Sequence, residues 1–473
     1  MYKLLPFVIF FFTLSGKLFP QYLAPQAGGE FQSPTDKCVC LTEEERQRII
    51  ADNKKAADEL IAQGKITLQK TLAVNFVWPL KQASNLNDYS YYGISNFVDH
   101  NPNIGQLLDY NNGARTYDIP GYNHKGTDIF TWPFGWYKMD NSQVEIIAGA
   151  DGVIIGKDNG SYDRNCGFNS NNWNAVYLMH ADGSTSWYGH MKNNSLTTKG
   201  VGQNVSAGEY LGIVGSSGSS TGPHLHLEIY DSGNNLIDPW FGPGNPTINS
   251  SWWQNQKPYF DPKVNKIATH SNWPAFPSCP QQEILNIKNN FVSNETVYFV
   301  TYYQDQLNGM NSSYQVSTPD NLVWYQWNHS IPDSFYSASY WGWSINLPPN
   351  AAQGNWRFSV VFNGWEYSHT FQVNVPNAVG DENEIPNRYF ISDNYPNPFN
   401  PVTKINYSIP HYDLVTIKLY DVLGNEVRTL ENNYKPMGNY DLVIDAGGLR
   451  SGVYFVSFNA GKFRETKKIV LAK

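Results

Sequence analysis

Charged residues are scarce in this sequence of 473 residues. Lys, Arg, Asp and Glu together make up 16% of the chain, whereas a typical soluble domain has about 25%. The 33 basic residues are outnumbered by 41 acidic ones, which gives a formal net charge of −8. Nucleic acids and anionic membranes require a broad basic surface, so we expect neither of them as a partner.

Cysteine is also rare, and its spacing excludes a common zinc motif. The sequence has Cys38, Cys40, Cys166 and Cys279, and no two of them form a C-x-x-C pair. This spacing argues against a zinc–thiolate site. The even number is typical of an exported protein with disulfides. We expect Cys166 to pair with Cys279 or with one of Cys38 and Cys40, and the sequence leaves that choice open.

Long apolar runs are missing after the first 16 residues. The run at 4–14 is almost wholly apolar, follows Lys3 and ends at Ser15 and Gly16. It has about half of the ~20 residues that a membrane-spanning helix needs, and its layout is that of a signal peptide, which we assign to residues 1–22. We therefore expect export of the chain, and no transmembrane segment in its mature form.

Aromatic residues, by contrast, are abundant at 15% of the sequence. The length predicts about three domains of roughly 150 residues each. A two-residue alternation of polar and apolar residues, clearest at 295–303 and 356–362, predicts a mainly β protein built from antiparallel sheets. For residues 280–376 we predict an immunoglobulin-like β-sandwich, in which most tryptophans fill the core and do not form a carbohydrate-binding platform.

One short helix is predicted near the N-terminus. Thr42 is a suitable cap, Glu45 occupies the capping-box position, and apolar residues recur at near-helical spacing up to Gly64. We assign residues 38–70 to a helical leader. Amphipathic helices usually pack against a domain, so a packing or spacer role is favoured over that of a regulatory propeptide. The sequence does not decide whether the leader inhibits the activity of the chain.

Histidine is infrequent, with ten in the chain, and several lie in short motifs between residues 120 and 230. His124 and Asp128 are four residues apart, but Gly126 and β-branched Thr127 between them disfavour a helix. We therefore predict a turn that leads into a strand. At this spacing alone, the pair is more often a surface hydrogen bond than a metal site.

A second motif lies at 222–228. Here His224, His226 and Glu228 alternate with apolar residues, which is the pattern of a strand with one polar and one apolar face. Both imidazoles then point to the same side and suit a metal site better than a core. His190, between the two motifs, has neighbours that fit an exposed loop equally well.

Together the three motifs resemble those of the lysostaphin/LytM-type zinc metallopeptidases. They read H-K-G-T-D at 124–128, W-Y-G-H-M at 187–191 and G-P-H-L-H-L-E at 222–228. The resemblance covers residues 71–245, which we assign as the peptidase domain, and implies an antiparallel β core of the duplicated hybrid motif type. Insertions at 85–117 and 158–174 depart from the family pattern, so the family's substrate preference is not carried over.

The resemblance also implies a site and a reaction. One Zn²⁺ is expected on His124, Asp128 and His226, with His190 and His224 as the catalytic histidines that move the proton. No H-E-x-x-H motif occurs, so a glutamate base of the thermolysin kind is not available. The implied reaction is hydrolysis of peptide bonds, with peptidoglycan cross-links as the expected substrate and other peptides as an alternative.

Three further residues are assigned supporting roles, and a rival function is kept open. Glu228 either orients His226 or is a solvated charge on the strand, and Tyr117 or Tyr122 is a candidate donor to the oxyanion. The rival is an inactive cell-surface protein that binds wall peptides or glycans through its peptidase-like and Trp-rich domains. A degenerate domain would be expected to have lost a ligand, so the complete motif set favours the enzyme.

The last 85 residues resemble the C-terminal sorting domain of type IX secretion substrates. The motifs are N-Y-P-N-P-F-N-P at 394–401, L-Y-D-V-L-G-N-E-V at 419–427 and L-R-S-G-V-Y-F-V at 449–456. We predict a small β-sandwich over 389–473, with linkers at 377–388 and 246–279. The resemblance implies passage through the periplasm of a diderm bacterium, and then secretion or surface attachment by the type IX machinery.

Overall fold

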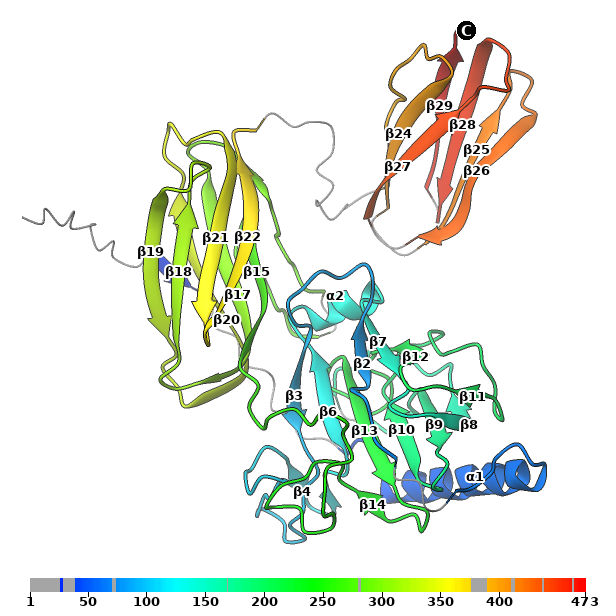
Figure 1. Cartoon of the computed structure of the whole chain (residues 1–473), viewed down its shortest axis with the longest axis vertical. Coiled ribbons are helices and arrows are strands. Elements are labelled where there is room, and N and C mark those ends of the chain that lie inside the picture. The colour runs from blue at the N-terminus through cyan, green and yellow to red at the C-terminus, as the bar shows by residue number, and fades with distance from the viewer. Residues whose placement is uncertain are drawn as a thin grey trace, which may run out of the picture.

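A computed structural model describes most of the chain. The described residues are 26–28, 39–69, 74–167, 169–279, 282–375, 389–409, 413–435, 438–461 and 463–473. The expected signal peptide at 1–22, the expected linker at 377–388 and Cys38 lie outside these residues. Figure 1 shows strands throughout the chain, so the prediction of a mainly β protein of largely antiparallel sheets is confirmed.

The predicted peptidase domain at 71–245 is built from two sheets around one core. The larger sheet has the strand order β11-β8-β9-β10-β13-β6-β3, with β14 paired to β13. Its strands are β3 (Tyr92–Asn96), β6 (Thr127–Thr131), β8 (Gly152–Asp158), β9 (Ala175–Met179), β10 (Thr185–Gly189), β11 (Asn204–Val205), β13 (His224–Tyr230) and β14 (Leu236–Ile237). The smaller sheet, in the order β12-β7-β2, contains β2 (Leu80–Gln82), β7 (Val144–Ile147) and β12 (Tyr210–Ile213).

The apolar faces of these two sheets meet in the core. Leu225, Leu227 and Ile229 of β13 pack into the same cluster as Ile146 of β7 and Leu211 of β12. The alternation predicted for 224–229 is therefore present, because these residues face the core and the intervening histidines face the opposite side. The hairpin of β4 (Asp118–Ile119) and β5 (Tyr122–Asn123) precedes β6, and the short helix α2 (Gly135–Asp140) follows it.

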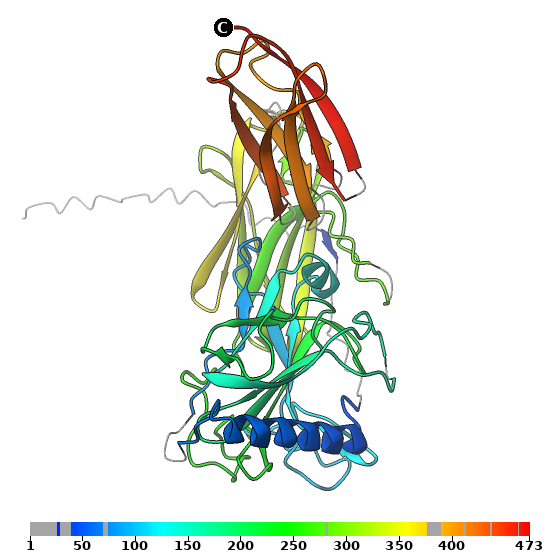
Figure 2. The same cartoon turned by 90° about the vertical axis from the view of Figure 1, so that its right-hand side faces the viewer.

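The predicted leader helix is α1 (Glu43–Ala62), which carries the expected capping box. The Thr42 side chain accepts from the Glu45 amide, and the Glu45 side chain accepts from the Thr42 amide at 3.0 Å. Ile49 and Leu60 lie in one apolar cluster with Val153 and Ile155 of β8. Figure 2 shows the helix, in blue, lying across the peptidase domain, so the leader is docked on this domain.

The second domain consists of two sheets that share one aromatic core. One has the order β1-β20-β17-β15, and the other β16-β22-β21-β18-β19. The strands are β1 (Gln26–Gly28), β15 (Lys263–His270), β16 (Asn290–Phe291), β17 (Thr296–Leu307), β18 (Asn311–Ser317), β19 (Val323–Ser330), β20 (Phe335–Asn346), β21 (Gly354–Phe362) and β22 (Trp365–Val373). Trp327, Trp343 and Trp356 are buried in the core, whereas Trp365 is 70% exposed.

Strand β15 lies inside the range 246–279 that was expected to be a linker. It pairs with β17 over most of its length, so the second domain includes residues before 280. The sequence gives little sign of this strand because its polar Asn265 is fully buried, where it donates to the Tyr92 carbonyl of the peptidase domain at 2.9 Å. A buried polar residue with a partner disrupts the usual alternation.

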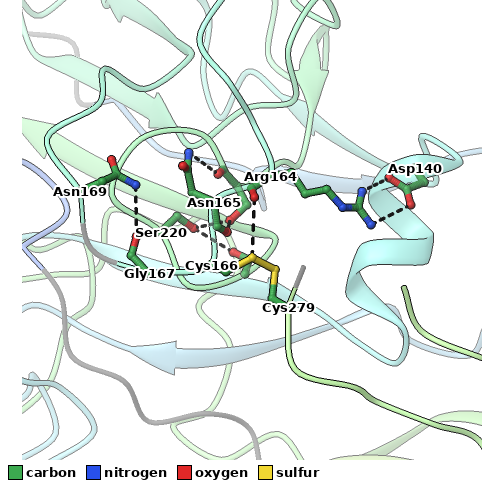
Figure 3. Close-up of a disulfide and its surroundings, with 10 residues drawn as sticks. Asp140, Arg164, Asn165, Cys166, Gly167, Asn169, Ser220 and Cys279 are labelled. Atoms are coloured by element: carbon green, nitrogen blue, oxygen red, sulfur yellow. Dashed lines mark hydrogen bonds and ion pairs between the residues drawn. A yellow bond between two sulfur atoms is a disulfide. The ribbon is translucent and has the colours of Figure 1, made fainter. Parts of the chain in front are cut away.

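The peptidase and second domains are joined by covalent, apolar and ionic contacts. Cys166 and Cys279 form a disulfide, which is one of the pairings left open above (Figure 3). Trp132 and Phe134 share an apolar cluster with Tyr302 and other residues of the sheet β17–β20. A buried ion pair links Arg115 to Asp305 at 2.6 Å.

The C-terminal domain, orange to red in Figure 1, contains two sheets of its own. Their orders are β23-β24-β27 and β26-β25-β28-β29, and both contribute to one core that includes Ile405, Ile417 and Phe458. The strands are β23 (Phe390–Ile391), β24 (Val402–Ile409), β25 (Asp413–Tyr420), β26 (Glu426–Lys435), β27 (Gly438–Asp445), β28 (Gly452–Ala460) and β29 (Phe463–Leu471). Among the described residues of the whole chain, neither helix combines the length and the apolar character that crossing a membrane demands.

Candidate metal centre and active site

The three residues expected to bind a metal converge at one end of the larger sheet. His124 follows β5, Asp128 lies on β6, and His226 lies opposite Asp128 on the neighbouring strand β13. The His226 Nδ1 atom is 2.7 Å from one oxygen of Asp128, and the His124 Nε2 atom is 2.9 Å from the other. The His124 Nε2 atom is buried and has no hydrogen-bond geometry to any partner, which is how a ligand atom faces an ion.

The remaining polar atoms of this triad are held by neighbours. The His124 Nδ1 atom lies 2.7 Å from the Phe97 carbonyl oxygen, and the His226 Nε2 atom lies 2.8 Å from Glu228. Asn96 donates to Asp128 at 3.1 Å. Such outer contacts set the orientation of histidine and carboxylate ligands at metal sites. Two imidazoles and one carboxylate that face each other form a donor set suited to zinc.

The electrostatics of the cluster favour a bound cation. Burial opposes ionisation of Asp128, but His124 and His226 hold the pKa of its carboxyl far below the usual value. Burial also disfavours the charged form of His124, yet the Asp128 carboxylate raises the pKa of His124 to about 9. Without a cation, two protonated imidazoles would balance the negative charge of the carboxylates. A bound metal ion would supply that positive charge and leave both imidazoles neutral.

Glu228 is buried, so it is not a solvated strand charge. Its side chain has no exposed surface, and it accepts from His226 and from Arg46 of α1. Burial would raise the pKa of Glu228, but the Arg46 guanidinium and His226 lower it to about 2. The carboxylate therefore stays ionised and holds the His226 ring from the side opposite to Asp128.

His190 and His224 lie next to the triad, with ring centroids 4.4 Å apart. The His190 Nδ1 atom is 2.6 Å from the Ser217 carbonyl oxygen, and the His224 Nδ1 atom is 2.8 Å from that of Gly222. A carbonyl accepts only, so in each neutral ring Nδ1 carries the proton and Nε2 keeps its lone pair. The His190 Nε2 atom is buried without a hydrogen-bond partner, and the His224 Nε2 atom lies 3.7 Å from Asp128.

The backbone at His190 is strained, and burial keeps its ring neutral. Its φ of 61° lies in the left-handed region, which costs a non-glycine residue roughly 1–2 kcal/mol. The conformation is held by a hydrogen bond from the Met191 amide to the Asn174 carbonyl at 2.9 Å. Burial and the nearby His224 lower the pKa of His190. Strain of this kind is concentrated at functional sites.

Two glycines of the motifs are required by close packing around these rings. A Cβ atom on Gly126 would lie 2.7 Å from the ring of His226, and one on Gly189 would lie 2.2 Å from the ring of Trp173. Trp173 meets the His190 ring edge to face, with centroids 5.3 Å apart. This tryptophan lies near the end of the Asn-rich insertion at 158–174, and the sequence alone indicates no role for it.

The two candidate oxyanion donors differ in their surroundings. The Tyr117 ring stacks on His124 with centroids 4.5 Å apart, and Tyr117 lines the open groove described below. The Tyr122 hydroxyl is buried without a hydrogen-bond partner and is not part of the groove lining. Of the two, Tyr117 is therefore placed to reach a substrate.

An open groove of about 780 Å³ leads to the site. Asp128 and His224 line it from the peptidase side, and Phe335 and Ser337 line it from the second domain. Cys166 and Cys279, whose disulfide is drawn in Figure 3, also line the groove. The second domain therefore shapes the approach to the ligands.

The leader contributes two residues that sequence reasoning missed. The Cys40 sulfur and the ligand atoms of His124, Asp128 and His226 all lie within 4.8 Å of one another, and Cys40 forms a second such group with His190, His224 and His226. The absence of C-x-x-C spacing does not exclude a thiolate here, because the tertiary structure brings in Cys40 from more than 80 residues away. Arg46 is the second residue, through its contact with Glu228.

Comparison with known protein families finds two matches. Residues 122–239 match peptidase family M23, and residues 393–472 match the secretion system C-terminal sorting domain. The first range contains the five residues predicted to bind the metal or move the proton, and it begins after Tyr117. The second agrees with the sorting domain expected from the terminal motifs.

The curated relatives named here match short segments of the chain. A segment of 86 residues is 43% identical to the DD-carboxypeptidase/endopeptidase Mpg of Neisseria meningitidis, covering 18% of this chain and 17% of the relative. Another segment, of 110 residues, is 33% identical to the peptidoglycan DD-endopeptidase ShyC of Vibrio cholerae, covering 23% of this chain and 21% of the relative. A third of 134 residues is 31% identical to the glycyl-glycine endopeptidase ALE-1 of Staphylococcus capitis, covering 28% and 32%. The chain thus spans at most about a third of these relatives.

Similar solved structures include two peptidases. One is a zinc-containing peptidase from Vibrio cholerae, at 22% identity and a TM-score of 0.22, covering 35% of this chain and 39% of that one. The other is the catalytic domain of lysostaphin from Staphylococcus simulans, at 23% identity and a TM-score of 0.19, covering 34% of this chain and 96% of that one.

Proposed function

Because the chain carries a domain of peptidase family M23 at 122–239 and a secretion sorting domain at 393–472, we propose that it is an exported zinc endopeptidase that cleaves peptide bonds of peptidoglycan. The observation that carries the proposal is the convergence of His124, Asp128 and His226, with the unpaired Nε2 atom of His190 beside them. The three relatives named above are endopeptidases by name, and one of them is named a peptidoglycan DD-endopeptidase.

In this proposal each residue has a separate task. His124, Asp128 and His226 would hold the ion through Nε2, a carboxylate oxygen and Nδ1. Zinc in such a site supplies Lewis-acid polarisation of the scissile carbonyl and of the attacking water. With Nδ1 held by a carbonyl, the Nε2 atom of neutral His190 or His224 would accept the proton of the water and return it to the leaving amine.

Two further residues assist. Glu228 fixes the ring of His226 through Nε2, so that Nδ1 stays directed at the ion. Tyr117 lines the groove beside His124, and its hydroxyl is the candidate donor to the developing oxyanion.

The first test measures zinc content and cleavage. We expect about one zinc per chain, and soluble peptide fragments released from purified cell-wall sacculi and identified by mass spectrometry. A chelator should abolish release, and added zinc should restore it. Both the native sequence and a Cys40→Ser variant are assayed, because Cys40 lies among the ligands. Binding of sacculi without cleavage by either zinc-loaded protein would favour the rival, inactive surface protein.

The second test separates ligands from proton-transfer residues. The variant His190→Ala should keep its zinc and lose turnover, whereas the matched variant His124→Ala should lose both. Zinc loss in His190→Ala with native circular dichroism would show that the ligand assignment is wrong.

Export is the remaining part of the proposal. The sorting domain supports transfer across an outer membrane by the type IX machinery, after a signal peptide has directed the chain to the periplasm. Deletion of residues 389–473 in the native host should leave the protein in the periplasm, as cell fractionation would detect. Unchanged secretion of the truncated chain would contradict this assignment.

A further inference from the structure

The Cys40 side chain lies between the proposed zinc ligands and the proposed catalytic histidines. Its sulfur belongs to both groups of close ligand atoms, the one with His124, Asp128 and His226 and the one with His190, His224 and His226. Cys40 is 3% exposed, and its sulfur is 3.3 Å from the Tyr117 hydroxyl oxygen. It therefore lies where a substrate carbonyl or the attacking water would have to bind.

The surroundings independently indicate a closed metal site. The Nε2 atoms of His124 and His190 are both buried and without hydrogen-bond partners, and both rings are 0% exposed. His226 is also 0% exposed, so the open groove reaches only the Asp128 and His224 side of the site. Hydrolytic zinc sites have three protein ligands and an open position, whereas closed sites have four. With Cys40 the set is two imidazoles, one carboxylate and one thiolate.

The position of Cys40 is fixed by the helix that follows it. Cys40 stands two residues before Thr42, the cap of α1, and α1 is held by apolar packing on β8. Arg46, in the first turn, pairs with Glu228, whose carboxylate also binds His226. Lys125, next to His124, pairs with Glu43 at 2.7 Å. Both ion pairs attach the start of the helix to residues adjacent to ligands.

The chain has a further point of attachment on the second domain, ahead of the leader. Strand β1 (Gln26–Gly28) adds to the edge of β20, with Ala27 opposite Trp343. The chain is thus bound on the second domain before Cys40 and on the peptidase domain after it. Attachment on both sides limits the freedom of the thiol and raises its effective concentration at the ligands.

We propose that Cys40 is the fourth zinc ligand of the full-length chain and that the leader thereby keeps the peptidase latent. The proposal rests on the zinc site proposed above. On closure a Zn–S bond forms, the thiol proton passes to solvent, and one water molecule leaves the ion. Proteolytic removal or withdrawal of the leader breaks that bond and returns the position to water and substrate.

X-ray absorption at the zinc edge tests the ligand directly on the full-length protein. The native chain should show one sulfur neighbour at about 2.3 Å, and Cys40→Ser should show nitrogen and oxygen neighbours alone. The matched control is Cys38→Ser, which removes the other cysteine of the leader and should keep the sulfur signal. Zinc with nitrogen and oxygen ligands in the native chain would overturn this inference and leave the proposed function intact, whereas absence of zinc would overturn both.

Cleavage of sacculi tests latency. If the thiolate occupies the site in more than nine molecules of ten, Cys40→Ser should release fragments at least about tenfold faster than the native chain and Cys38→Ser. Arg46→Met, which weakens leader docking but keeps the thiol, should raise the rate in the same direction. A sulfur signal in the native chain with equal rates in all four proteins would show a structural zinc site and refute latency.

Discussion

Replacement of Arg46 by methionine tests how the leader is bound. The Arg46 side chain is 3% exposed and its partner Glu228 has no exposed side-chain surface, so the substitution leaves a buried carboxylate without its cationic partner. Breaking a buried ion pair in this way costs about 3–5 kcal/mol. Glu228 keeps its contacts with His226 and with the Tyr230 hydroxyl, so we expect about 3 kcal/mol. When the leader undocks, Glu228 becomes hydrated again and the buried unpaired charge is relieved. The substitution should therefore lower the free energy of leader docking and leave the stability of the sheet unchanged.

Hydrogen exchange separates these two effects. Amide protection in α1 should fall by about a hundredfold, the equivalent of about 3 kcal/mol, while protection in β13 stays unchanged. The matched control is Arg48→Met, two residues along the same helix, whose pair with Asp52 is exposed at 51% and 67% and should contribute at most about 1 kcal/mol. Equal effects of the two substitutions would refute the reasoning. So would a double-mutant cycle of Arg46→Met with Glu228→Gln that gives a coupling near zero.

Two other substitutions test burial and close packing. Glu283 accepts from the Tyr137 amide, and burial raises the pKa of its carboxyl to about 7. Between pH 4.5 and pH 7 the native state therefore keeps a proton that the unfolded chain has released. The free energy of unfolding should fall by up to about 3 kcal/mol over this range as the pH rises. Glu283→Gln should remove this pH dependence of the free energy of unfolding, as measured in urea. If the native chain and the variant differed in stability by the same amount at pH 5 and at pH 8, the burial argument would be contradicted. Gly126→Ala should displace the His226 ring and weaken zinc binding by about 10–100-fold in chelator competition. The control Gly167→Ala, where a Cβ meets nothing within 4 Å, should leave the affinity unchanged, and a similar loss in both variants would contradict the packing argument.

Much of the fold was predictable because local patterns agree with it. The capping box at Thr42 and Glu45 forms as expected, since its two hydrogen bonds join residues three positions apart. The alternation at 224–229 predicts a strand with its apolar side in the core, and β13 has this arrangement. The sequence predicts a linker where β15 lies, because the buried Asn265, whose amide nitrogen donates to a distant carbonyl, interrupts the alternation of the strand.

The candidate site was predictable in part. Sequence motifs and the family resemblance single out His124, Asp128, His190, His224 and His226, and the structure brings all five together. Trp173 and Arg46 were missed, because neither lies in a motif and each acts through a contact with a residue that is distant in sequence. Glu228 was identified without its state of burial, which depends on the packing of α1.

By itself, the sequence determined which residue types were available and the local conformation of each motif: a capped helix, alternating strands, and glycines where rings approach the backbone. These features depend on residues a few positions apart. Tertiary structure decided which of the pairings open to Cys166 was formed, that Glu228 is buried, and that Cys40 lies among the proposed ligands. Each of these depends on the free energy of bringing together segments about 80 to 180 residues apart, which no local pattern records. The role of the leader was left open for the same reason, because the helical pattern of 43–62 shows that it packs but not what it covers.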